Sequence, residues 1–430
     1  MVFSNLKAPI SVQYELTSGC NNRCEYCYNY WRYFGNFAVD ELDKVSAERI
    51  VRKVGEAEVF DFLFTGGEPL LRKNILFELI PIAKEYNMSV SLNSNLRLCS
   101  KEDAKKMKEM GIGSIITSLP SCDPKLTDEI TQIQGSFNEI IRGIEYVTEA
   151  GNKIAVNMVV TRKNENQVYD TGKFLYKNFG IDKFMATPIN PSCSNHTSFE
   201  LDKSRLIRTL DDLLRLEGDF NISVDVLEPL PYCLINDPKY HQFMLRSCSA
   251  GATTLTIGSN GEARPCSHSS KVYGNVLNED IQDIWAKMRE WRDGSLIPED
   301  CKNCAEIIKC GGGCRVHAEL KTGDLRGNDP WMKGPLKERI EKRVKVSEFD
   351  TNKTYIVSPR IRWRFEGDGK YCISPRPGKM IIGNRELYDL IKILVKEKKI
   401  VLHDITMKYG YEERFIKSFL QLLYINNFIE

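Results

Sequence analysis

The sequence predicts an α/β protein that begins with a partial (β/α)6 barrel and continues with a cysteine-rich region and a small α+β domain. Three observations predict this fold class. From Ile10 to about Thr187, short β-rich apolar runs alternate with longer helical patterns, as in a parallel sheet wrapped by helices. Residues 248–332 are rich in cysteine and glycine and hold few long periodic runs. The last 80 or so residues begin with short strands and end with apolar-periodic helices.

Six βα units account for the barrel. Strands are expected at residues 10–16, 59–64, 89–93, 113–118, 154–160 and 182–186. Helices are expected between them at residues 45–56, 74–86, 101–110, 136–150 and 166–178. Because the carboxyl ends of parallel strands meet at one edge of a sheet, the loops after the strands should carry the ligand site.

Length and composition limit the class of protein. The 430 residues exceed what one hydrophobic core usually organises, so we expect domains at residues 1–235, 236–335 and 350–430. No apolar run approaches the roughly 20 residues of a membrane span, and the N-terminus lacks a signal-peptide pattern, which predicts a cytoplasmic protein without a membrane partner. The net charge of +2 predicts no dominant polyanionic partner.

The 14 cysteines are many for a chain without a secretion signal. Clustered cysteines in a reducing compartment are more often ligands of metals or clusters than disulfides. The most specific cluster is Cys20, Cys24 and Cys27, with C-x3-C-x2-C spacing. Three thiolates bind three irons of a four-iron cluster and leave one iron open to a substrate or cofactor. Zinc is the alternative, but it is usually closed by four ligands, and the nearest histidine is His196.

A second motif, Gly66-Gly67-Glu68-Pro69, follows the second expected strand. Two glycines let a backbone approach a ligand closely, and the Glu68 carboxylate can accept a hydrogen bond from a cationic amine. Together with the cysteine triplet and Tyr26, this motif resembles the radical S-adenosylmethionine (radical SAM) enzymes.

The resemblance implies a [4Fe-4S] cluster on the triplet, S-adenosylmethionine on its open iron, and hydrogen abstraction by a 5′-deoxyadenosyl radical. It also implies an electron donor such as flavodoxin or ferredoxin. The cofactor contacts that it implies come from Tyr26, Gly66, Gly67, Glu68, Asn95, Ser118 and Thr161. One position departs from the family: many relatives have an arginine where this chain has Thr131.

Six further cysteines follow an ordered spacing: Cys248, then Gly261-x4-Cys266, then Cys301-x2-Cys304-x5-Cys310-x3-Cys314. A zinc site is the alternative here as well. The pattern closely resembles the SPASM extension of radical SAM enzymes, which holds two auxiliary iron–sulfur clusters, expected as [4Fe-4S]. The resemblance implies that Cys248, Cys266 and Cys314 bind the first auxiliary cluster, and that Cys301, Cys304 and Cys310 bind the second.

The chain departs from the SPASM pattern at two fourth-ligand positions. The family's seventh cysteine is missing after Asp329-Pro330, and no extra cysteine follows Cys248 closely. The candidates to fill these positions are Asp324, Asp329 or Met332 for the second auxiliary cluster and Cys233 for the first. The favoured interpretation of Cys233, Cys193, Cys122 and Cys99 is that they are ordinary thiols.

Residues 350–430 are expected to form three short strands followed by three helices. This order resembles the small winged-helix-like chaperone of pyrroloquinoline quinone biosynthesis, a domain that binds the leader of a precursor peptide as an added edge strand. The segment has 15 Lys and Arg against 10 Asp and Glu, which suits an acidic leader or nucleic acid. Its basic residues are dispersed, which makes nucleic acid the less favoured partner.

The sequence therefore predicts a radical SAM/SPASM maturase that modifies a ribosomally made precursor peptide by crosslinking, thioether formation, excision or a similar reaction. The alternatives are an enzyme of the same class that acts on a small molecule or protein, as in haem modification or sulfatase maturation, and a cluster-dependent DNA-binding regulator. Asp225, Glu228 and Cys122 are the weak candidates for a catalytic group.

Overall fold

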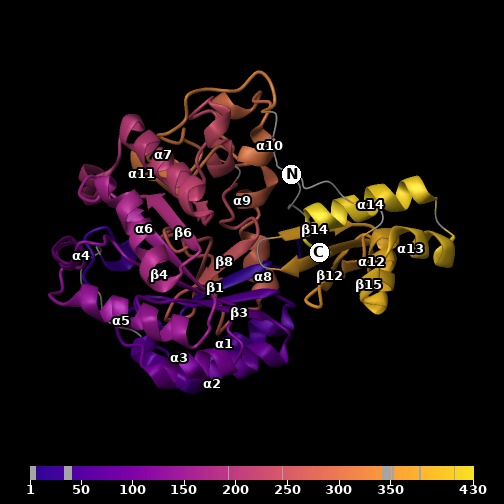
Figure 1. Ribbon diagram of the computed structural model, residues 1–430. Helices are drawn as coiled ribbons and strands as arrows, with labels where there is room; N and C mark the ends of the chain where they lie inside the picture. The colour runs from indigo at the N-terminus through magenta and orange to yellow at the C-terminus, as the bar shows by residue number, and fades with distance from the viewer. Residues whose placement is uncertain are drawn as a thin grey trace. The chain divides into compact units, whose positions relative to one another are not determined.

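The computed structural model describes residues 6–32, 41–191, 193–244, 246–340, 350, 353–376, 379–410 and 412–430. The chain divides into two compact units (Figure 1). The first unit comprises residues 8–341 with 1–4, and the second comprises residues 342–430 with 5–7. The barrel and the cysteine-rich region thus share one unit, and their expected division near residue 235 stays a prediction.

A ten-stranded sheet forms the centre of the first unit, in the order β10-β9-β8-β1-β2-β3-β4-β5-β6-β7. Strands β1 to β7 are parallel to their neighbours, and all six strands expected from the sequence are present. The strands are β1 (Ser11–Glu15), β2 (Asp61–Thr65), β3 (Ser89–Asn93), β4 (Ser114–Ser118), β5 (Ile154–Val160), β6 (Lys183–Pro188), β7 (Ser223–Asp225), β8 (Thr254–Ile257), β9 (Glu262–Arg264) and β10 (Gly274–Asn275).

The cysteine-rich region adds its own strands to this sheet. Strand β8 pairs in parallel with β1, and β9 and β10 continue from β8 in antiparallel fashion. The register places Ser11 opposite Thr254 and Tyr14 opposite Ile257. The region therefore lies directly beside the first strand of the barrel.

Helices cover the sheet, and α1, α2, α3 and α5 lie along one side of it (Figure 1). Their starts follow from local sequence: Ser100 and Asp103 form a capping box on α3, and Asp43, Asp123 and Asp202 cap α1, α4 and α7. The helices are α1 (Lys44–Glu56), α2 (Lys73–Glu85), α3 (Lys101–Glu109), α4 (Pro124–Thr131), α5 (Ser136–Glu149), α6 (Val168–Phe179), α7 (Lys203–Phe220), α8 (Ile281–Lys287), α9 (Glu290–Asp293), α10 (Ile307–Cys310) and α11 (Arg315–Thr322).

The core of the first unit lies on both faces of the central strands. Val12, Tyr14, Phe62 and Phe64 are fully buried, and the Tyr14 ring lies 6.2 Å from that of Phe62. Strands buried on both faces are typical of a parallel sheet covered by helices. None of the helices in the described residues combines the length and the apolar character needed to cross a membrane.

The second unit has a core of its own, which includes Leu390, Ile391, Leu420 and Phe428. Its three-stranded antiparallel sheet has the order β12-β13-β14, and a separate pair joins β11 to β15. The three strands and three helices expected from the sequence are present, and the structure adds two short strands, β11 before them and β15 between α12 and α13. The elements are β11 (Tyr355–Ile356), β12 (Arg362–Gly367), β13 (Lys370–Arg376), β14 (Lys379–Gly383), α12 (Arg385–Glu397), β15 (Lys399–Ile400), α13 (Leu402–Tyr409) and α14 (Glu413–Ile425).

Candidate active site

The first cysteine set, Cys20, Cys24 and Cys27, lies in the loop after β1. Burial raises the pKa of Cys20 to about 11, and it also raises the pKa of Cys24 and Cys27 above the ordinary thiol value. The charges of Cys27 and Cys20 add to the rise in the pKa of Cys24, so the three sulfurs are neighbours. Such thiols ionise when a metal or cluster binds them.

The glycine motif packs against the backbone of this same loop. The backbone N–H of Gly67 donates to Thr17 O at 2.7 Å, and that of Glu68 donates to Gly19 O at 2.8 Å. A Cβ on Gly67 would collide with the carbonyl of Gly19, and one on Gly66 would collide with that of Thr17. The two glycines therefore allow the loops after β1 and β2 to meet, a role in addition to the expected approach to a ligand.

Glu68 is fully buried and connects the loops after β2 and β3. Its Oε1 accepts from the backbone N–H of Leu70 at 2.9 Å and from Ser94 Oγ at 2.7 Å. Its Oε2 accepts from the backbone N–H of Asn95 at 2.7 Å. Burial raises the pKa of Glu68, and these hydrogen bonds oppose that rise. The Glu68 carboxylate, which was expected to bind the amine of a ligand, thus already accepts three hydrogen bonds from groups of the protein itself.

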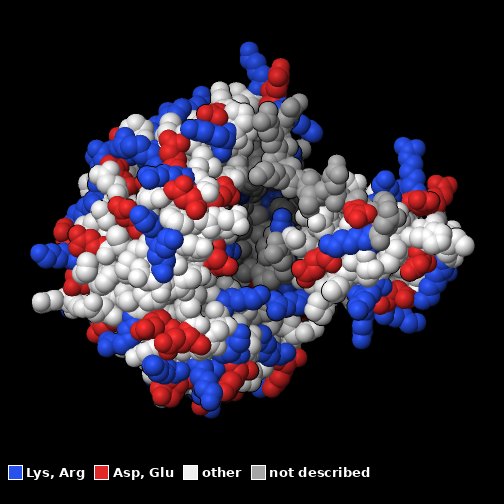
Figure 2. Space-filling model, in the orientation of Figure 1, with Lys and Arg blue, Asp and Glu red and all other residues white. Residues whose placement is uncertain are grey.

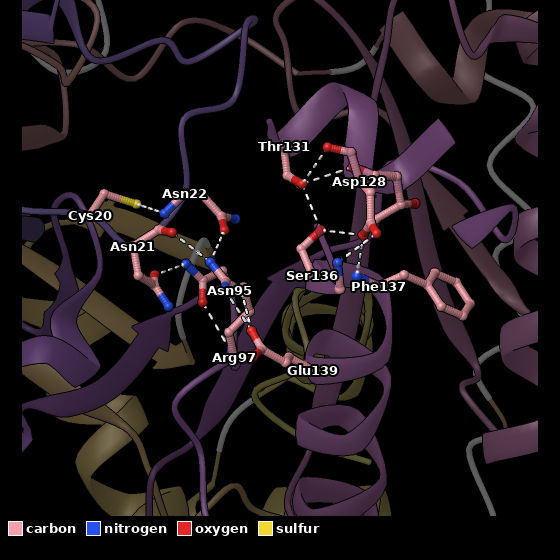
Figure 3. Close-up of polar contacts among 12 residues, drawn as sticks. Cys20, Asn21, Asn22, Asn95, Arg97, Asp128, Thr131, Ser136, Phe137 and Glu139 are labelled. Atoms are coloured by element: carbon pink, nitrogen blue, oxygen red, sulfur yellow. Dashed lines mark hydrogen bonds and ion pairs between the residues drawn. The ribbon is translucent and has the colours of Figure 1, made fainter. Parts of the chain in front are cut away.

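Arg97 holds the cysteine loop against the end of β3 and against α5 (Figure 3). Its Nη1 donates to Asn21 O at 2.5 Å and to Asn22 Oδ1 at 2.7 Å. Its Nε donates to Glu139 Oε2 at 2.7 Å. Asn95 Nδ2 also donates to Asn21 Oδ1, at 2.7 Å. The sequence pattern did not point to Arg97; its place two residues after Asn95, in a loop at the carboxyl edge, is the signal that could have found it.

Thr131, which stands where relatives have an arginine, is buried in a network of hydroxyl groups (Figure 3). Its Oγ1 lies 2.6 Å from Ser136 Oγ and donates to Thr127 O at 2.9 Å. The backbone N–H of Arg23 donates to the carbonyl of Thr131 at 3.0 Å. The end of α4 therefore supports the cysteine loop through its backbone and offers no positive side chain at this position.

The other expected cofactor contacts lie at several distinct places. Tyr26 is buried against Ile130 and Ile189. Ser118 is the last residue of β4 and is half-buried. Thr161 is buried in a turn, where its N–H donates to Asn164 Oδ1 at 2.7 Å.

The three catalytic candidates have different surroundings. Cys122 is half-buried, and its backbone N–H donates to Thr171 Oγ1 at 3.0 Å. Asp225 is in an exposed ion pair with Arg246, at 2.7 Å. Glu228 is half-buried, and it contacts Asn190, which also donates to Cys314 of the second cysteine set.

The second cysteine set is Cys248, Cys266 and Cys314. Burial raises the pKa of all three thiols, that of Cys266 to about 12, and the charge of Cys248 raises it further for both Cys266 and Cys314. Asn190 Nδ2 donates to Cys314 Sγ at 3.1 Å. The backbone N–H of Cys314 donates to Asp329 Oδ2 at 2.7 Å, so Asp329 contacts this set and not the third set, for which it was a candidate.

The third cysteine set is Cys301, Cys304 and Cys310. The Sγ of Cys301 lies 3.2 Å from Met332 Sδ, and the backbone N–H of Leu336 donates to Cys304 Sγ at 3.3 Å. Hydrogen bonds from backbone N–H groups to sulfur are typical of cluster ligands. Asp324 is in an exposed ion pair with Arg326.

A group of polar side chains connects the first and second cysteine sets. The His268 ring stacks on that of Tyr28, and His268 Nε2 lies 3.8 Å from Glu228 Oε1. Glu228 Oε2 accepts from Asn190 Nδ2 at 3.0 Å. In the described structure the buried atoms His268 Nδ1 and Asn190 Oδ1 have no hydrogen-bond partner, so the group can take further polar contacts. None of the sequence motifs marked His268 or Asn190.

A buried ion pair joins β1 to the loop that carries Cys266. Arg264 and Glu15 are both almost fully buried and contact each other through Nη2 and Oε2. Arg264 Nη1 also donates to Ser269 O at 3.1 Å. A buried pair of this kind is costly to break, because removing one partner leaves the other charge without compensation.

The donor sets supply the thiols that iron–sulfur clusters take as ligands. No three His, Cys, Asp or Glu side chains in the described part of the chain converge closely enough to hold one metal ion. Each set instead offers three neighbouring thiols, with backbone or amide donors to sulfur at Cys20, Cys304 and Cys314. An iron–sulfur cluster spreads its thiolate ligands over several irons, which matches this arrangement.

Comparison with known families agrees with this chemistry. The model of the radical SAM superfamily matches residues 14–175, and that of the SPASM iron–sulfur cluster-binding domain matches residues 248–305. The chain is a radical SAM enzyme with a SPASM domain. The cofactors of this radical SAM enzyme are S-adenosylmethionine and iron–sulfur clusters.

Similar proteins fall into two groups. The AdoMet-dependent heme synthase of Methanosarcina barkeri is 24% identical over 340 residues, which cover 75% of this radical SAM enzyme and 96% of the relative. The AdoMet-dependent heme synthase of Nitratidesulfovibrio vulgaris is 25% identical over 341 residues, which cover 74% of this chain and 90% of the relative. Among solved structures, Streptococcus suis SuiB bound to its precursor peptide SuiA has a TM-score of 0.60 at 20% identity and covers 76% of each chain. The structure of anSMEcpe with bound AdoMet and a peptide has a TM-score of 0.60 at 20% identity. The match covers 75% of this chain and 93% of the anSMEcpe chain.

Proposed function

We propose that this radical SAM enzyme is a maturase that modifies a ribosomally made precursor peptide at an unactivated carbon. The observation that carries the proposal is the second unit, a separately packed domain with a three-stranded antiparallel sheet and three helices, joined to a radical SAM enzyme. In the described residues β14 pairs only with β13, so its other side is an edge that a peptide can extend. Such a domain has a clear use when the substrate is a peptide with a leader.

The surface of the second unit suits an extended, partly apolar and acidic ligand. On α14, Phe415, Leu422 and Ile425 are exposed, although each is large and apolar. The excess of basic residues in 350–430 favours an acidic leader. On the visible face of the first unit, basic and acidic side chains are interspersed (Figure 2), which is less suited to nucleic acid.

The cysteine sets are assigned to the cofactors as follows. The first set would hold the cluster that binds S-adenosylmethionine, the second set the first auxiliary cluster, and the third set the second auxiliary cluster. Bound S-adenosylmethionine and a reduced cluster supply a 5′-deoxyadenosyl radical that abstracts a hydrogen atom from the substrate.

The chain's own residues orient the substrate and handle protons. Gly67, Glu68 and Arg97 fix the cysteine loop relative to the carboxyl ends of β2 and β3. Glu228, between His268 and Asn190, is placed to accept a proton from the substrate at a carboxylate oxygen. The stacked rings of Tyr28 and His268 hold the loops of the first and second cysteine sets together.

Haem synthesis is the second candidate, because the heme synthases match about three quarters of this chain. Co-expression with each short peptide found to be encoded near the gene, followed by mass spectrometry, separates the two functions. A mass change in the peptide supports the proposal. Conversion of a haem precursor with an unchanged peptide would refute it.

A variant of the second unit sharpens this test. Ile381→Pro removes a backbone N–H and disfavours strand pairing at β14, so it should weaken leader binding in a titration of the full-length protein. Met407→Ala, an exposed position on α13, is the matched control and should bind the leader normally.

A further inference from the structure

The third cysteine set has one ligand fewer than a closed four-iron cluster requires. Cys301, Cys304 and Cys310 supply three thiolates, and a [4Fe-4S] cluster that only transfers electrons has four. Met332 is the sulfur-bearing residue that follows Asp329-Pro330 in the sequence. The structure brings another sulfur to this set from a distant part of the chain.

One short segment, residues 332–336, contacts three cysteines. Met332 Sδ lies 3.2 Å from Cys301 Sγ. The next residue, Lys333, donates its backbone N–H to Cys233 Sγ at 3.3 Å. Leu336 donates its backbone N–H to Cys304 Sγ at 3.3 Å. Cys233 is therefore held by the same segment that covers the third set.

A second contact comes from the residue next to Cys233. The backbone of Tyr232 is hydrogen-bonded to Cys310, a member of the third set. This contact and the hydrogen bond from Lys333 to Cys233 Sγ place Cys233 beside the third set, whereas the sequence had made it a candidate for the first auxiliary cluster.

The loop around Cys233 is arranged to present its sulfur. The backbone N–H of Leu234 donates to Pro231 O at 2.9 Å, which closes a tight turn. Tyr232 and Leu234 on either side are 3% and 1% exposed, and Cys233 between them is half-buried. The neighbours fix the turn in the core while the thiol stays available, so a ligand at this position needs little rearrangement.

We propose that Cys233 is the fourth ligand of the second auxiliary cluster, completing the set of Cys301, Cys304 and Cys310. A thiolate is the ligand that iron–sulfur clusters take most often, and its negative charge compensates that of the irons. The thioether of Met332 is neutral and a weak acceptor, so it packs against the cluster ligands and does not replace one. Four cysteines close the cluster, which then serves electron transfer and not substrate binding.

This inference rests on the proposed cluster assignment and is independent of the peptide substrate. Its test uses the full-length protein reconstituted without oxygen, with iron and sulfide analysis and electron paramagnetic resonance. Three four-iron clusters give about 12 irons per chain. Cys233→Ala should lose about one of these irons and show a three-iron signal after oxidation, because a cluster corner without its thiolate releases iron.

Matched variants decide between the two sulfurs. Met332→Leu should keep the full iron content, and so should Cys99→Ala, which removes a buried thiol from the barrel. The proposal is overturned if Cys233→Ala keeps all its iron, or if Met332→Leu gives the three-iron signal instead. Wild-type protein with iron for only two clusters would overturn the cluster assignment as well.

A third variant covers the case in which Cys233→Ala loses iron from every cluster through misfolding. Cys233→Ser keeps an oxygen that can bind iron and should move one of the three reduction potentials while the other two stay constant. Three unchanged potentials would reject Cys233 as a ligand.

Discussion

The imidazole of His268 stacks on the phenol ring of Tyr28, with centroids 4.9 Å apart and planes 7° from parallel. Tyr28 follows Cys27 directly, and His268 follows Cys266 by two residues. This one contact joins the loop of the first cysteine set to the loop of the second set. The contact therefore holds the two loops at a fixed separation from each other.

Replacing His268 tests whether this contact serves the reaction. His268→Ala should destabilise the protein by about 1 kcal/mol and reduce product formation at least tenfold, while cleavage of S-adenosylmethionine without substrate continues. His268→Phe keeps the stacking, so it should restore stability in a urea titration but not product formation. Recovery of both properties in His268→Phe would limit the residue to packing.

Glu228 should be the proton acceptor and Asp225 should not. Glu228→Gln keeps the shape and the contact with Asn190 but removes the charge, so product formation should fall by about 10² or more. Asp225→Asn breaks only an exposed ion pair with Arg246 and should stay within about twofold of the wild type. Product yields measured by mass spectrometry compare the two, and equal losses would contradict this assignment.

Arg97→Ala should loosen the first cysteine loop. The guanidinium loses its bonds to Asn21, Asn22 and Glu139, a cost of about 3 kcal/mol in the free energy of unfolding. Iron at the first set should fall with it. Arg142→Ala, an exposed arginine on α5, is the control and should change stability by less than about 0.5 kcal/mol. Urea unfolding and iron analysis are the measurements, and normal iron in Arg97→Ala would refute the role.

Gly67→Ala should prevent the loops after β1 and β2 from meeting, because the added Cβ collides with the backbone of Gly19. We expect weak binding of S-adenosylmethionine in equilibrium dialysis and little cofactor cleavage. Gly218→Ala, within α7, meets no atom within 4 Å and should be neutral or stabilising by up to about 1 kcal/mol. Normal cofactor binding by Gly67→Ala would show that the close approach is not needed.

Asp128 gives a pH-dependent contribution to stability. Burial raises its pKa, but hydrogen bonds from Phe137, Gly135 and Ser136 outweigh this and hold the pKa below its ordinary value. A carboxyl group whose pKa is lower in the folded than in the unfolded state stabilises the fold at pH values above its unfolded-state pKa. This stabilisation is lost as the pH falls below about 4. Asp128→Asn should therefore cost at most about 1 kcal/mol at pH 7, and the difference should be smaller at pH 3. Urea titrations of the cluster-free protein at both pH values test it.

The sequence predicted the six barrel strands because each is a short apolar run. It pointed to the first cysteine set through the local C-x3-C-x2-C spacing, whereas the grouping of the six later cysteines into two sets came from the resemblance to the SPASM extension. It did not predict helix α7 or helix α4, which is only eight residues long. It also did not predict that β8 pairs with β1, because this pairing depends on residues far apart in the chain.

The same reason explains the missed site residues. Arg97, Asn190 and His268 acquire their roles through contacts with loops 38 to 240 residues away along the chain. For Cys233, the sequence offered only a candidate role at the first auxiliary cluster, with an ordinary thiol favoured, because its partner segment at Lys333 lies 100 residues further on. Glu68 was recognised, but its internal donors from Ser94 and Asn95 were visible only in three dimensions.

The pairing of β1 with β8 has a consequence for synthesis on the ribosome. Ser11 emerges about 240 residues before Thr254, its partner across the sheet. Until then one edge of β1 carries unpaired backbone groups beside three reactive thiols, a state open to aggregation and to oxidation. Chaperones and the cell's cluster-assembly machinery therefore have the longest access to Cys20, Cys24 and Cys27, and slowing translation before residue 254 should lower the yield of intact protein.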